Sequence, residues 1–207
     1  MRKVLLIAVA VSALSLGAAN AKTVSDPVND FLATYTGAHT ADLDVTSFSV
    51  DYDAATTNFT LSATMAGPIN AASGNLYVIG ADTGTGTIHP FAALGEPNVL
   101  FNQAIVVAAT GVTTIGGHPN LAATISGDMF SVVVPLADLP STGWTPADYG
   151  FNLWPKNSAN SISDFSPQNA LLAAAPEPGV WAMMMVGLAM VGFAMRRSKG
   201  GLKAVTA

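Results

Sequence analysis

The chain has 207 residues, half of them hydrophobic, with a formal net charge of −5 and no cysteine. The lack of cysteine excludes disulfides, thiol catalysis and thiolate metal sites. Residues 22–174 are far more acidic than the whole, because two basic residues, Lys22 and Lys156, stand against twelve acidic ones, which gives a net charge of −10. Without a basic patch, nucleic acid and anionic lipid surfaces are unsuitable partners.

Residues 1–21 have the pattern of a secretory signal peptide. Two basic residues precede an apolar run, and Ala19-Asn20-Ala21 supplies the small residues of a cleavage site. We therefore expect contact with an export translocon and a signal peptidase, and a mature chain that begins at Lys22. The alternative is an uncleaved N-terminal anchor.

The middle of the chain shows the period-two alternation of half-buried strands, separated by turn residues. The predicted strands are Val45–Tyr52, Asn58–Met65, Leu76–Ile79, Val99–Val107, Ala123–Ser126, Met129–Val134 and Tyr149–Trp154. Gly127-Asp128 predicts a hairpin turn between two of them, and Pro155 is expected to end the last one. No amphipathic helix of ten or more residues is predicted. These patterns indicate an all-β, antiparallel β-sandwich-like single domain over residues 22–166.

The C-terminal region contains a proline-bracketed break, an apolar run and a basic stop. Residues 167–175 are predicted to form a linker, and residues 180–195 a transmembrane helix of about 24 Å. That length is short against a hydrocarbon core of about 30 Å, which suits a transient anchor in the inner membrane. Arginines after the helix predict a cytoplasmic tail over residues 200–207.

Residues 176–199 resemble the PEP-CTERM sorting signal of Gram-negative bacteria, in its Pro-Glu-Pro-x-x-Trp-Ala form. The residues that carry the resemblance are Pro176, Glu177, Pro178, Trp181, Ala182, Met183, Met184, Gly187, Gly192, Arg196 and Arg197. The resemblance implies recognition by an exosortase, processing near the Pro-Glu-Pro, and a connection to exopolysaccharide and the cell surface. The chain departs from the family in the ten residues that follow Arg197. An ordinary C-terminal membrane anchor is the alternative.

Few residues form patterns that point to chemistry. The histidines, His39, His89 and His118, are widely spaced and are interpreted as loop residues. The Gly-rich stretch 83–87 lacks the Lys-Ser/Thr of a phosphate loop, so it is read as a turn.

Two acidic pairs offer carboxylates on one face of an extended chain: Asp42 with Asp44, and Asp51 with Asp53. Such pairs are possible Ca²⁺ ligands, although neither fits the twelve-residue Ca²⁺ loop. A glycosidase would also need two carboxylates. No metal, cofactor or catalytic residue is assigned, and calcium is left open.

Aromatic residues gather between positions 144 and 154. Trp144 and Trp154 are candidates for stacking on sugar rings if they are exposed, but the favoured interpretation is that this group fills the core. We expect a non-enzymatic cell-surface or exopolysaccharide-matrix protein. The alternatives are a carbohydrate-binding module, with or without calcium, and an exported hydrolase.

Overall fold

The computed structural model describes residues 21–85, 90–116 and 118–173, together with Gly187, Leu188 and Met190. The predicted signal peptide (apart from Ala21) and the cytoplasmic tail lie outside these residues, as do the end of the linker and most of the sorting segment. The three described C-terminal residues have helical backbone. In the part of the chain that the structure describes, no helix has the length and apolarity needed to cross a membrane.

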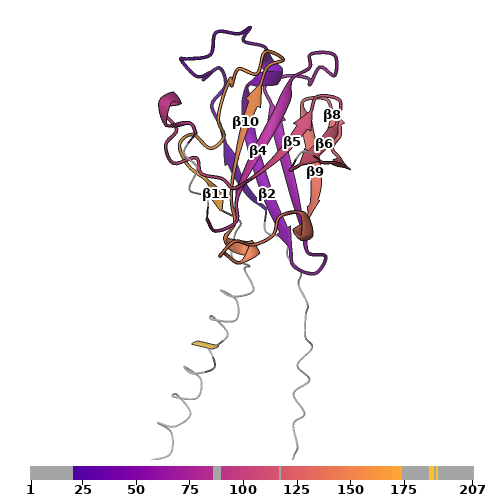
Figure 1. The fold of residues 1–207 in the computed structure, drawn as a ribbon, viewed down its shortest axis with the longest axis vertical. Coiled ribbons are helices and arrows are strands. Elements are labelled where there is room, and N and C mark those ends of the chain that lie inside the picture. Colours follow the sequence, from indigo (N-terminus) through magenta and orange to yellow (C-terminus); the bar gives the residue numbers. More distant parts are fainter. Residues whose placement is uncertain (1–20, 86–89, 117, 174–186, 189, 191–207) are drawn as a thin grey trace, which may run out of the picture.

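The domain is all-β and consists of two antiparallel sheets (Figure 1). The five-stranded sheet has the order β1 (Lys22–Ser25), β2 (Val45–Asp53), β3 (Asn58–Met65), β9 (Met129–Pro135) and β8 (Thr124–Ser126). The six-stranded sheet has the order β11 (Leu172–Ala173), β10 (Gly150–Lys156), β4 (Leu76–Asp82), β5 (Gln103–Ala108), β6 (Val112–Ile115) and β7 (His118–Ala122). Four short 3₁₀ turns lie in the connections: η1 (Ala41–Leu43), η2 (Ala92–Leu94), η3 (Leu136–Asp138) and η4 (Pro146–Asp148).

The two sheets share one hydrophobic core, in a sandwich-like arrangement. In β3 the alternation predicted from sequence is confirmed, with Phe59, Leu61, Ala63 and Met65 all buried. The six-stranded sheet contributes side chains such as Tyr77 to the same core. Strand β4 is buried on both faces from its second residue onward, as its continuous apolar run predicts.

A second, smaller core lies on the outer face of the six-stranded sheet. Val78, Val99, Trp154 and Phe165 are buried there under loop segments. Gly80 makes room for this layer, because a Cβ at that position would lie 2.6 Å from two ring atoms of Trp154. This second layer explains why β4 needs apolar residues on both faces.

The sequence interpretation is wrong at two places around β10. The strand does not end at Pro155 but continues to Lys156, and the Pro155 carbonyl accepts a hydrogen bond from the Ser163 amide at 3.1 Å. A proline ends a strand only where the ladder needs its missing N–H.

The start of the predicted linker belongs to the domain. The Asn152 side-chain amide donates to the carbonyls of Pro167 and Ala170 at 2.6 and 2.9 Å, and β11 pairs with β10. The domain therefore extends to Ala173 rather than ending at residue 166, because partly buried hydrogen bonds and the pairing of β11 hold this proline-containing segment against β10.

Candidate functional site

Four aspartates from three segments of the chain meet where the start of β2 lies against the segment beside β10. Carboxylate oxygens of Asp30, Asp44 and Asp164 all lie within 4.8 Å of one another. Asp26 is close enough to raise the pKa of Asp164 through charge repulsion. We call these four residues the aspartate cluster.

Backbone amides fix Asp164 at the centre of this arrangement. Its Oδ2 accepts a hydrogen bond from the Val45 amide at 2.9 Å, and its Oδ1 accepts one from the Phe165 amide at 2.7 Å. The neighbouring Ser163 hydroxyl donates to the Leu43 carbonyl at 2.8 Å. The segment beside β10 is thus fastened to the end of η1 and to the first residue of β2, although it lies more than a hundred positions beyond them in sequence.

The other carboxylates are only partly satisfied by the described residues. Asp44 Oδ2 accepts from the Asn29 amide at 2.8 Å, and Asp30 Oδ2 accepts from the Gln168 side chain at 2.9 Å. In contrast, Asp44 Oδ1, Asp30 Oδ1 and Asp26 Oδ2 are buried and have no hydrogen-bond partner there. A buried carboxylate oxygen without a partner is costly, so each of these atoms requires an explanation.

Burial and like charge together disfavour ionisation of the cluster. Burial raises the pKa of Asp164 to about 8 and that of Asp26 to about 6, and repulsion from neighbouring carboxylates adds to both increases. The pKa values of Asp30 and Asp44 are also raised, chiefly by burial. Neither of the two lysines in the domain acts on Asp26 or Asp164. The cluster is therefore a concentration of carboxyl groups that lacks a basic neighbour among the described residues, and its members resist full ionisation.

Two further polar groups adjoin Asp26. The Ser166 hydroxyl is fully buried and lowers the pKa of Asp26, yet its Oγ has no hydrogen bond of ordinary geometry among the described residues. Glu96 repels Asp26 and is itself buried, and it accepts a hydrogen bond from the Asn169 amide. Oxygen atoms thus dominate this part of the molecule.

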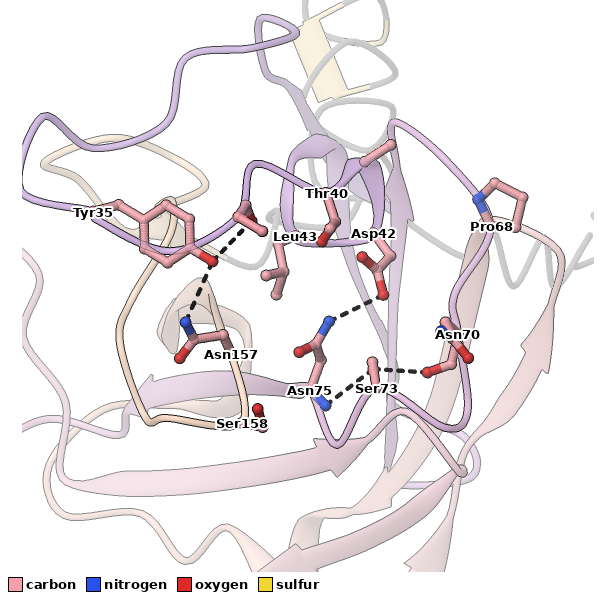
Figure 2. A pocket seen from close by; sticks show the side chains of 12 residues that line it. Tyr35, Thr40, Asp42, Leu43, Pro68, Asn70, Ser73, Asn75, Asn157 and Ser158 are labelled. Carbon is pink, nitrogen blue, oxygen red and sulfur yellow. Dashed lines mark hydrogen bonds between the residues drawn. The ribbon is translucent and has the colours of Figure 1, made fainter.

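A separate hollow of about 430 Å³ lies beside η1 (Figure 2). Its polar wall includes Asp42, which accepts a hydrogen bond from the Asn75 side chain at 3.0 Å. The Tyr35 hydroxyl donates to the Ala38 carbonyl at 3.1 Å and accepts from the Asn157 side-chain amide at 3.4 Å. Figure 2 shows Tyr35 beside Asn157 at one side of the hollow. None of the aspartate cluster lines this hollow.

The structure separates one of the two predicted acidic pairs. Asp42 faces the hollow whereas Asp44 belongs to the aspartate cluster, because η1 ends between them. Asp53 is exposed and accepts hydrogen bonds from the Ala55 amide and the Thr56 hydroxyl in the turn after β2. The interpretation of Asp42 and Asp44 as a two-carboxylate face is therefore wrong, and Asp44 instead joins a larger group of acids. Asp51 and Asp53 both lie in β2, two positions apart, so this pair does share one face of an extended strand, as predicted.

The two candidate stacking tryptophans also differ. Trp154 is only 4% exposed and packs against Phe91, Phe101 and Phe165, so it offers no surface to a sugar. Trp144 is 40% exposed, in the loop before η4. Of the histidines, His39 stacks on Phe31 with ring centroids 4.3 Å apart. His118 begins β7 and pairs with Ile115, so its interpretation as a loop residue is wrong. His89 and the side chain of His118 lie outside the described part.

Comparison with known proteins does not assign the chain to a family. No family model matches it, and no curated protein matches it either. Fold and site together define only a broad class: an all-β domain of two antiparallel sheets that carries a partly buried cluster of carboxylates.

Proposed function

We propose that this chain is an exported, non-enzymatic protein of the cell surface or exopolysaccharide matrix, sorted by its C-terminal segment. The observation that carries the proposal is the order and spacing of the Pro-Glu-Pro, Trp-Ala, apolar and Arg-Arg elements over residues 176–199. An exosortase would recognise this segment, and the inner membrane would hold it until processing.

The limits of the folded domain support this proposal. Strand β1 begins at Lys22, the residue after the predicted signal cleavage site, and pairs with β2 from its first residue. At the other end, β11 places Ala173 on the sheet, three positions before Pro176. Cleavage at both expected sites would therefore release the domain with every strand intact.

The test is the intact mass of the protein recovered from membrane and medium fractions of its host. The expected species begins at Lys22 and ends between Pro176 and Pro178, with or without an added group. A species that retains every residue through Ala207 and occurs only in the membrane would contradict sorting, and would make the segment an ordinary anchor. An N-terminus at Met1 would contradict signal cleavage.

The hollow favours carbohydrate binding as a second candidate function. Its wall combines one tyrosine with side-chain amides, hydroxyls and a single carboxylate, Asp42. These groups can hydrogen-bond sugar hydroxyls, whereas a typical glycosidase needs two carboxylates across the scissile bond. Binding without hydrolysis is the activity that this hollow supports.

Substitution in the hollow tests this second function. Asn75→Ala removes one polar group from the wall and takes from Asp42 the side-chain amide that donates to it. We expect loss of retention on the host's own polysaccharide, measured by affinity electrophoresis, with Trp144→Ala as a comparison at the other candidate site. Retention that falls only in Trp144→Ala would assign binding to that loop, and retention unchanged in both variants would contradict carbohydrate binding here.

A further inference from the structure

We propose that the aspartate cluster is a calcium site, in which Asp30, Asp44 and Asp164 supply carboxylate oxygens and Asp26 adds a further ligand or charge. This inference concerns residues on the folded domain and does not depend on how the chain is sorted. It assigns to the domain a hard divalent cation as ligand.

The separations of the oxygens fit such an ion. Three atoms within 4.8 Å of one another can all lie no more than about 2.8 Å from a common centre, the value for an equilateral triangle of that side. Ca²⁺ binds oxygens at roughly 2.3–2.6 Å, so the three carboxylates need only a small contraction to reach it.

Unsatisfied buried groups provide the second line of evidence. Asp44 is only 1% exposed, and its Oδ1 has no hydrogen-bond partner among the described residues while its Oδ2 is held by Asn29. Asp30 Oδ1, in a second member of the cluster, is likewise buried and without a hydrogen-bond partner among those residues. A cation ligated by these oxygens satisfies them at once and neutralises the repulsion between the carboxylates.

The donor set selects among cations. All the candidate ligands are carboxylate oxygens, and the group contains no histidine. Oxygen-only sites suit Ca²⁺, Mg²⁺ or Mn²⁺, whereas Zn²⁺ and Cu²⁺ favour imidazole or thiolate. Ca²⁺ accepts six to eight ligands in irregular geometry, which suits carboxylates that come from three loops better than the strict octahedron of Mg²⁺.

The decisive variant is Asp44→Asn. Its side-chain oxygen can keep the hydrogen bond from the Asn29 amide, while an amide group replaces the unpartnered Oδ1 and can donate to neighbouring carboxylates. The variant thus removes one charge and one ligand without emptying the site. Asp53→Asn is the matched control, because Asp53 is an exposed aspartate at the far end of β2, roughly 26 Å along the strand from Val45.

The experiment measures thermal unfolding of the full chain in mild detergent, after treatment with EDTA, with and without added CaCl₂, together with calorimetric titration. For the wild type we expect one ion per chain, and a rise in Tm of roughly 5–10 °C at a Ca²⁺ concentration 100 times Kd. Equimolar MgCl₂ should give a smaller rise. Asp53→Asn should keep the Ca²⁺ response, and Asp44→Asn should lose it while its metal-free Tm rises.

Several outcomes would overturn the proposal. A wild-type chain with neither binding heat nor a Ca²⁺-dependent Tm would show that the carboxylates are simply protonated in the folded state. An Asp44→Asn chain that retains the full response would place any Ca²⁺ elsewhere. If Asp44→Asn does not fold, Asp30→Asn applies the same criterion at a half-exposed position, where loss of the response supports the site and its retention refutes it.

Discussion

Replacing Trp154 with alanine should be among the most damaging single changes in the domain. The side chain is 4% exposed and meets Phe91, Phe101 and Phe165 at ring-centroid distances of 4.9, 5.1 and 6.1 Å. A buried tryptophan removes about 150–250 Å² from water, which at about 25 cal/mol per Å² corresponds to roughly 4–6 kcal/mol. Measured Trp→Ala losses of about 3–5 kcal/mol agree with this range.

For a domain of this size, such a loss lowers Tm by roughly 6–20 °C, which thermal unfolding followed by circular dichroism will measure. Trp154→Phe should lose less, because it keeps a ring in the layer. Trp144→Ala is the control: its backbone amide bonds the Thr83 carbonyl, its side chain is 40% exposed, and we expect a change within about 1 kcal/mol. A Trp154→Ala loss below about 1 kcal/mol would refute the second core.

Three other predictions follow from the structure. Gly80→Ala should cost about 1–3 kcal/mol in urea unfolding, because its Cβ would lie 2.6 Å from the Trp154 ring; an unchanged midpoint would contradict that contact. Asn152→Ala leaves two carbonyls of the 167–173 segment without their donor, so limited proteolysis should cut there faster than in the wild type, and equal rates would show that β11 alone holds the segment. The third prediction concerns pH and applies with divalent cations chelated. The pKa of Asp164 is about 8 in the folded state against 3.8 in the unfolded chain, so between these values the folded state keeps a proton that the unfolded chain loses. The contribution of Asp164 to stability is therefore complete below about pH 4 and is lost as the pH rises through about 8, so Tm should fall between pH 5 and 9; a rising Tm would contradict the burial of this carboxyl.

The local alternation of apolar and polar residues was sufficient to predict the strands in the central part of the domain. The alternation over residues 58–65 depends only on which side chains face the core, and the Gly127-Asp128 turn joins β8 to β9 as predicted. Gly127 has a φ of +62°, a conformation that glycine adopts at little cost. Such signals are contained within a few neighbouring residues, so the sequence displays them directly.

Three short strands, β1, β7 and β11, could not be predicted from local sequence, because each forms only by pairing with another strand. Strand β1 has four residues and exists because Lys22 pairs with Val50, and β11 has only two residues, paired with β10. Strand β7 contains Pro119, which counts against a strand in any local reading. Tertiary pairing decided these cases.

The aspartate cluster shows the same limit for the site. Asp26 and Asp30 are four positions apart and lie in a loop where no periodicity applies, and Asp164 stands 120 positions beyond Asp44. Sequence drew attention to Asp44 through its pairing with Asp42, but the structure gives Asp44 different companions. Carboxylates that converge through loop closure leave no spacing to recognise. The useful signal was the charge balance of −10 with only two lysines, which guarantees acids without basic partners but does not place them.

The aspartate cluster and the hollow are joined by one segment of chain. Residues 26–44 contribute Asp26, Asp30 and Asp44 to the cluster, and the same segment gives the hollow Tyr35 and Asp42. This segment contains no strand, so side-chain and backbone bonds hold it in place of a ladder. A cation at the cluster would fasten it at both ends, because Asp26 and Asp44 flank it. If the cluster binds a cation and the hollow binds a sugar, ordering of this shared segment by one ligand would lower the entropy cost of binding the other. Linkage then predicts that each ligand strengthens the binding of the other by the same factor, which titration of Ca²⁺ with and without the polysaccharide will measure.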